Sequence, residues 1–227
     1  MRYALVQDIR AEATPAARGV CSNCGSPMIA RCGRVKVWHW AHKGRHPCDP
    51  WWEAETDWHR SWKDRFPKDW QEVVHTDEIT GEKHIADVKN SFGLVIEFQH
   101  SPLHPSELLA RETFYRDMIW IVDGCRGELD AAFFRMGLGK AIQENPLAFP
   151  LQWWGRSRLL HNWSEAKSNV YLDFGGDDLW RLVFFNTTKK VGAVGPIHKS
   201  ALIEDCMTGT NIRVSYRSQN DNASQLE

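Results

Sequence analysis

Residues 84–101, HIADVKNSFGLVIEFQHS, decide the predicted fold of this chain. Apolar residues flank Glu97, and the side chains of an extended strand point alternately to its two faces, so Glu97 and Gln99 would share one face. Residues 85–88 predict the neighbouring strand, and residues 90–93, NSFG, predict the turn between the two strands. This hairpin would bring Asp87 beside Glu97.

The two acids of the hairpin, Asp87 and Glu97, form the first candidate site. A buried carboxylate is unfavourable unless it is paired or bound to a metal. Two carboxylates held close together repel each other unless a cation lies between them. Such hard oxygen ligands suit Mg²⁺ or Mn²⁺. The alternative is an exposed hairpin with ordinary surface acids, because an aspartate and a glutamate at this spacing occur by chance in many proteins.

The composition limits the class of protein. The chain has 227 residues, which is enough for a sizeable core and one or two domains. Its net charge is −1, so any contact with nucleic acid must come from a local basic patch. Because the sequence has no long apolar run and no signal peptide, we expect a cytoplasmic protein without a membrane partner.

Cysteine and histidine residues between positions 21 and 48 have the spacing of a metal site. A Cys-x-x-Cys turn, CSNCG, presents two thiolates to one point, and Gly25 stands where such a turn often needs a residue without a side chain. Four ligands of this kind can close a tetrahedral zinc site, and a site filled by protein alone is structural. In a reducing compartment this pattern favours a metal over disulfides, the alternative being free buried thiols. The candidates are Cys21, Cys24, His39, His42 and Cys48.

These five candidates are one more than a tetrahedral site needs. His42 is favoured over His39, because His39 precedes Trp40 in a predicted strand and could instead orient a ligand or pack. Cys32 could compete as a ligand, but its arginine and glycine neighbours predict a hairpin turn. The choice between the two histidines stays open at this stage.

Residues 53–66 predict a helix, with acidic residues near its start and Pro67 after its end. Glu55, His59 and Lys63 are each four residues apart and would share one face. Taken alone, this face predicts solvated salt bridges. Placed directly before the hairpin, the same face could point into a metal site.

The rest of the chain predicts an α/β protein. Residues 71–76 predict a strand before the hairpin, residues 106–116 a helix after it, and residues 118–122 a buried strand. The order helix, three strands, helix, strand predicts a mixed sheet. Further expectations are a strand in 1–7, a loop up to 19, a helix in 128–143, an irregular segment in 146–154, a helix in 159–167 and a hairpin of 170–174 with 179–185.

Four parts of the chain follow from these elements. Residues 1–50 are a small, β-rich, zinc-binding module, and residues 51–126 are the core. Residues 127–207 are an α+β extension, and residues 208–227 are a polar tail that we expect to be mobile when alone.

Taken together, these motifs resemble the competence protein CoiA-like family, a branch of the PD-(D/E)xK nuclease superfamily. The resemblance covers roughly residues 21–124 and rests on the Cys-x-x-Cys, HWAH at 39–42, Cys48-Asp49, ETDWH at 55–59 with Lys63, IADV at 85–88, EFQHS at 97–101 and RETFY at 111–115. It implies a restriction-endonuclease-like core in which Asp87 and Glu97 bind the catalytic metal. Glu55 matches the acid of the first helix.

One position departs from the superfamily. Gln99 occupies the place of the usual lysine, which is thought to position or activate the attacking water. Glutamine can neither act as a base nor carry a charge. Either Gln99 only orients the water, or Lys63 reaches across from the helix. A third interpretation is a decayed site that binds DNA without cutting it.

The sequence therefore predicts a Mg²⁺- or Mn²⁺-dependent nuclease that hydrolyses DNA, in uptake, recombination or phage defence, with partner proteins of such a system. Asp87 and Glu97 would hold the metal, with Glu55 as a further candidate. Lys63, Gln99, His59 and Arg111 would position water or phosphate, and Trp51 and Trp52 would stack on bases. The alternatives are a non-catalytic DNA-binding accessory protein and a zinc-braced protein-interaction module.

Overall fold

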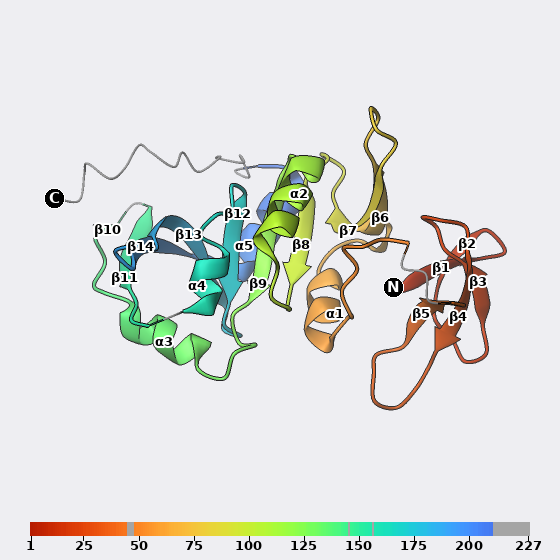
Figure 1. Ribbon diagram of the computed structural model, residues 1–227, viewed down its shortest axis with the longest axis horizontal. Coiled ribbons are helices and arrows are strands. Elements are labelled where there is room, and N and C mark those ends of the chain that lie inside the picture. The colour runs from red at the N-terminus through yellow and green to blue at the C-terminus, as the bar shows by residue number, and fades with distance from the viewer. Residues whose placement is uncertain (45–47, 145, 156, 211–227) are drawn as a thin grey trace. The chain divides into compact units, whose positions relative to one another are not determined.

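The computed structural model describes residues 1–44, 48–144, 146–155 and 157–210 (Figure 1). It is a mixed α/β structure with two sheets and few helices, and it divides into two compact units, Met1–Ile96 and a second that begins at Glu97. Most of the expected polar tail, residues 211–227, lies outside the described residues.

The first unit begins with a small antiparallel sheet in the order β2-β1-β3-β4-β5. Its strands are β1 (Tyr3–Val6), β2 (Ile9–Glu12), β3 (Arg18–Val20), β4 (Pro27–Arg31) and β5 (His39–His42). Met28 and Trp40 pack with Cys21 on the buried side of this sheet. The expectation of a loop up to residue 19 is wrong in part, because residues 9–12 pair with β1 despite the alanine-rich sequence that follows them.

The first helix of the same unit, α1 (Asp57–Lys63), is shorter than the expected helix over 53–66. Thr56 caps it: the hydroxyl of Thr56 accepts from the His59 amide, and the His59 ring accepts from the Thr56 amide. A capping box fixes where a helix begins. Glu55 therefore lies before the helix rather than on it.

Three strands follow the helix and a short 3-10 turn, η1 (Lys68–Trp70). They are β6 (Gln71–Thr76), β7 (Lys83–Lys89) and β8 (Val95–Gln99). The predicted hairpin is confirmed: β7 and β8 pair antiparallel through Val88↔Ile96 and Lys89↔Val95. The side chain of Asn90 accepts the amides of Phe92 and Leu94, which builds the turn.

The second unit contains the helix and strand expected next, α2 (Pro105–Tyr115) and β9 (Met118–Asp123). β9 pairs in parallel with β12 (Asn169–Asp173), which forms the expected hairpin with β13 (Asp178–Asn186). The strands continue through β14 (Val191–His198) and β11 (Leu147–Gln152) to β10 (Gln143–Glu144). The other helices are α3 (Asp130–Gly137), α4 (Arg158–Asn162) and α5 (Lys199–Thr208).

Several expectations for the second unit are wrong. The helix expected over 128–143 ends at Gly137, where a side chain would collide with the Gln152 carbonyl. The segment expected to be irregular contains β11, which keeps its place through pairing with β14 although it includes Pro150. The helix expected over 159–167 ends at Asn162. β14 and α5 were not predicted.

Candidate metal centre and acidic cluster

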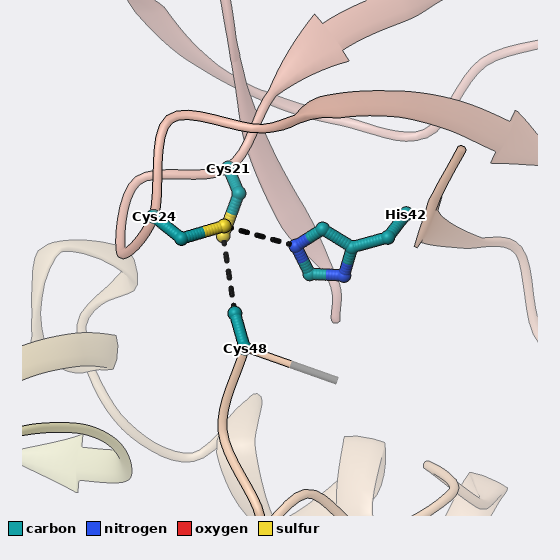
Figure 2. Close-up of side chains that lie close together, drawn as sticks. All are labelled: Cys21, Cys24, His42 and Cys48. Carbon is teal, nitrogen blue, oxygen red and sulfur yellow. Dashed lines mark hydrogen bonds between the residues drawn. The ribbon is translucent and has the colours of Figure 1, made fainter. Parts of the chain in front are cut away.

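Cys21, Cys24, His42 and Cys48 come together in the first unit (Figure 2). Their ligand atoms all lie within 4.8 Å of one another. The turn between the first two cysteines is closed by backbone hydrogen bonds from the Cys21 amide to the Ser26 carbonyl and from the Gly25 amide to the Cys21 carbonyl. Gly25 has a φ of +69°, which explains why a glycine follows Cys24.

Two distances within this cluster match those of a tetrahedral zinc site. The Sγ atoms of Cys21 and Cys48 are 3.7 Å apart, and the Cys24 Sγ lies 3.4 Å from His42 Nε2. Zinc bond lengths in a tetrahedron place two sulfurs roughly 3.8 Å apart and a sulfur and a nitrogen roughly 3.5 Å apart. The donor set and its spacing therefore suit zinc. His39 is not in this cluster, and its Nδ1 lies 2.8 Å from the Val37 carbonyl.

The thiols of the cluster differ in acidity. Burial raises the pKa of Cys24, but hydrogen bonds from Ser26 and His42 outweigh it and lower this pKa to about 6. Burial and the neighbouring Cys21 sulfur raise the pKa of Cys48 to about 12. Without a cation these thiols resist ionising together, whereas a bound metal favours the thiolate form of each.

A second cluster in the first unit surrounds Lys63, whose side chain is 5% exposed. The Lys63 Nζ lies 2.9 Å from Asp87 Oδ1, 3.2 Å from Glu72 Oε1 and 3.3 Å from Glu55 Oε1. Burial lowers the pKa of Lys63, but the three carboxylates outweigh it and hold this pKa well above its ordinary value. Lys63 is therefore a protonated ammonium at neutral pH.

Glu72 is a member of this cluster that the sequence analysis missed. It has a φ of +45° and stands between the β6–β7 pairs Gln71↔Val88 and Val73↔Ala86, opposite Asp87. Its carboxylate accepts the backbone amides of Arg2 and Tyr3. Burial raises the pKa of Glu72, but Lys63, the chain's N-terminus and these amides lower it to about 2.

Glu55 and His59 are held by neighbours in the same unit. The Glu55 carboxylate binds the Arg60 guanidinium at 3.0 Å. His59 is buried and takes part in the helix cap, and its Nε2 lies 3.5 Å from Glu53 Oε2. His59 therefore takes part in the cap that begins α1.

The remaining predicted site residues belong to the second unit. Glu97 is buried, and its Oε2 lies 3.0 Å from the guanidinium of Arg111, which also binds Glu107 at 2.6 Å. Gln99 is buried and donates to the Ser101 carbonyl at 2.9 Å. Arg111 thus acts as the counter-ion of Glu97 in this structure.

Residues 11–50 match the family model described as "Competence protein CoiA, N-terminal domain". No curated protein and no solved structure matches the chain. The matched segment contains all four members of the Cys/His cluster and ends before α1. The family match therefore covers only the N-terminal module, and the Lys63 cluster lies outside the matched residues.

Asp49 links the matched segment to β7 within the first unit. Its carboxylate accepts the Ile85 amide at 2.8 Å and the Trp51 amide at 2.9 Å, and it lies 2.8 Å from His84 Nδ1. Trp51 stacks on the His84 ring with centroids 3.3 Å apart, so one face of Trp51 is already covered. Trp52 is 55% exposed.

No helix among the described residues is both long and apolar enough to cross a membrane.

Proposed function

We propose that this chain is a metal-dependent nuclease that hydrolyses phosphodiester bonds of DNA. The observation that carries the proposal is the contact of 2.9 Å between Lys63 Nζ and Asp87 Oδ1, with Glu55 and Glu72 around the same ammonium. Burying the Lys63, Glu55 and Glu72 side chains together beside Asp87 costs desolvation energy that an apolar core would avoid. Buried groups with shifted pKa values, as Lys63 and Glu72 have, gather at functional sites more often than elsewhere.

The arrangement also supports the finer fold assignment. The order α1, β6, β7, β8, α2, β9 is the order helix, three strands, helix, strand that the resemblance to PD-(D/E)xK nucleases implies. In that fold the proposed metal ligands, Asp87 and Glu97, come from the second and third of these strands. We place the active site on these strands for this reason.

Oxygen donors such as those of Asp87 and Glu97 are the type of ligand that hard divalent cations prefer. Asp87 and Glu97 offer carboxylate oxygens, and the Asp87 side chain is 23% exposed, so an ion from solvent can reach it. A bound Mg²⁺ or Mn²⁺ would lower the pKa of a coordinated water and neutralise charge that develops on the phosphate.

The protein's own residues would then divide the remaining work. Lys63 holds the Asp87 carboxylate in place through their ion pair, and the raised pKa of Lys63 makes it a donor of hydrogen bonds rather than a base. Gln99 can orient a water molecule through its amide but cannot remove a proton. Glu55, which Arg60 holds in place, neutralises Lys63 and limits how far the ammonium can move.

The Cys/His cluster has a separate role in this proposal. Four protein ligands fill a tetrahedral zinc site and leave no position for substrate, so the zinc would be structural. It would stabilise the N-terminal sheet, whose strands are short and whose core is small.

Purified protein incubated with plasmid, linear and single-stranded DNA tests the proposal. Mg²⁺ and Mn²⁺ should each permit cutting, and leaving both out should prevent it. Omission is a better control than a chelator, which would also strip the structural zinc. If folded, zinc-loaded protein cuts none of the three substrates with either ion, the nuclease proposal is wrong.

One observation favours a second candidate, a DNA-binding accessory protein that does not cut. Glu97 is bound by Arg111 and Asp87 by Lys63, so the protein already supplies a cation to each proposed metal ligand. These two ion pairs, and Gln99 in place of the usual lysine, are what we would expect of a site that has lost catalysis. DNA binding without any cutting would favour this candidate.

A further inference from the structure

We infer that the N-terminal module carries a surface for single-stranded DNA on β3, β4 and the loop between β4 and β5. Here the basic surface means Arg18, Arg31, Arg34, Lys36 and Trp38. This surface would hold the DNA strand that the proposed nuclease cuts, so the inference rests on the proposed function. Its test measures binding and requires no cutting.

The charge of the module differs sharply from that of the whole chain. Residues 18–48 contain six Lys and Arg residues and no Asp or Glu, whereas the whole chain has a net charge of −1. Such a local excess attracts a polyanion where the whole protein does not. Residues 18–48 are therefore a locally positive region in a chain that is nearly neutral overall.

The register of the sheet gathers these cations on one face. Arg18 pairs with Ile29, and Ile29 and Arg31 are two residues apart on β4, so the side chains of all three point to the same side. The opposite side of β4 carries Met28, which packs in the core. Arg18 and Arg31 therefore share the outward face of the sheet.

The loop between β4 and β5 extends beyond the ends of these strands (Figure 1). Arg34 and Lys36 are exposed, and Val35 between them is 97% exposed. Among the described residues, none of the ion pairs involves Arg18, Arg31, Arg34 or Lys36. These cations remain available to phosphate groups.

Trp38 adds an aromatic platform to the cations. Trp38 is 46% exposed, yet its Nε1 donates to the Gly33 carbonyl at 3.1 Å and its own carbonyl accepts from Arg60. A large ring that is exposed and also fixed can stack on a base without losing further freedom. Because stacking needs a base that is not already paired within a duplex, single-stranded DNA is the partner that fits best.

The test measures binding of full-length, zinc-loaded protein to a fluorescein-labelled oligothymidine by fluorescence anisotropy, over a series of salt concentrations and without added Mg²⁺ or Mn²⁺. Each phosphate contact on a single strand contributes about 0.7 to the salt slope. The double variant Arg34→Ala/Lys36→Ala should lower the slope by about 1.4, which weakens binding about 25-fold at about 0.1 M salt.

Trp38→Ala should weaken binding by about 5- to 150-fold with an unchanged salt slope, and Trp38→Phe should recover part of the loss. The matched control is Lys140→Ala/Lys189→Ala, which removes two exposed charges from the second unit. It should stay within about twofold of the unaltered protein, because those residues are not part of the basic surface.

Three results would overturn the inference: no binding by the unaltered protein, an equal loss in the control variant, or Trp38→Ala binding as well as the unaltered protein. If Arg34→Ala/Lys36→Ala weakens binding to phosphatidylglycerol vesicles but not to the oligonucleotide, the surface binds lipid instead of DNA. The binding assay requires no cutting, so a protein that binds DNA without cutting it and a protein that does not bind DNA give different results.

Discussion

Lys63 of α1, which is buried, and Asp87 of β7, which is partly exposed, form an ion pair with a distance of 2.9 Å between Nζ and Oδ1. Glu72 stands opposite Asp87 in the β6–β7 register, where two like charges would otherwise repel each other. The ammonium of Lys63 relieves this repulsion. The two acids that the sequence predicted as metal ligands thus each have a cation of the protein beside them: Lys63 beside Asp87 and Arg111 beside Glu97.

Replacing Lys63 should destabilise the protein strongly. Lys63→Ala removes the cation shared by three carboxylates, and leaving buried charges uncompensated costs about 3–5 kcal/mol. Urea unfolding measures the change. The matched control is Lys68→Ala, whose side chain is 76% exposed and which should lose at most about 1 kcal/mol.

The same reasoning predicts partial recovery in a double variant. Lys63→Ala/Glu72→Gln removes one of the stranded charges together with the cation, so it should be more stable than Lys63→Ala alone. If the two variants are equally unstable, or if Lys63→Ala costs less than about 1 kcal/mol, the cluster is not held together as described.

Glu72 should make the free energy of unfolding depend on pH in the acidic range. Its pKa is lowered from an ordinary 4.5 to about 2, so its ionised form stabilises the folded state at pH values above about 4.5. This contribution declines as the pH falls from about 4.5 toward 2, because the unfolded chain takes up the proton first.

Glu72→Gln should therefore be less stable than the unaltered protein at pH 7, and the difference should shrink at pH values approaching 2. Urea unfolding at a series of pH values measures both. If the difference in free energy of unfolding between the two proteins stays constant from pH 7 down to about 3, the charge of Glu72 does not stabilise the folded state.

Zinc analysis of protein purified without added metal should find one zinc per chain. Cys21→Ser and His42→Ala should lose it, because both residues belong to the cluster. Cys32→Ser and His39→Ala, the two competing residues of the sequence analysis, should retain it. Less than about a tenth of an equivalent in folded, unaltered protein would contradict a structural zinc.

The hairpin of β7 and β8 was predictable because its signals are local. Alternation along residues 94–99 and the Asn-containing turn both act within a few residues of the chain, and the structure has this hairpin. The set of metal-site candidates was predictable for the same reason. The preference for His42 over His39 is confirmed, since His42 joins the three cysteines, but it could be settled only by the pairing of β4 with β5, which decides which ring faces the cysteines.

Glu72 could not be found from the sequence, because its role depends on partners far along the chain. Its carboxylate accepts amides of Arg2 and Tyr3, about seventy positions away, and its backbone adopts a positive φ that no glycine signals. The early start of the predicted helix has a similar cause. The acids before Thr56 suggested helix, but the reciprocal cap between Thr56 and His59 sets the boundary.

Thermal melting and DNA cleavage, run on the same preparation of Asp87→Asn, test the central claim most directly. The variant should remain folded, because Lys63 keeps Glu55 and Glu72 as partners, while Mg²⁺-dependent cutting falls at least about 100-fold. Glu78→Gln, an exposed acid of the same unit, should cut like the unaltered protein. A folded Asp87→Asn that cuts at the unaltered rate would contradict the assignment of this site.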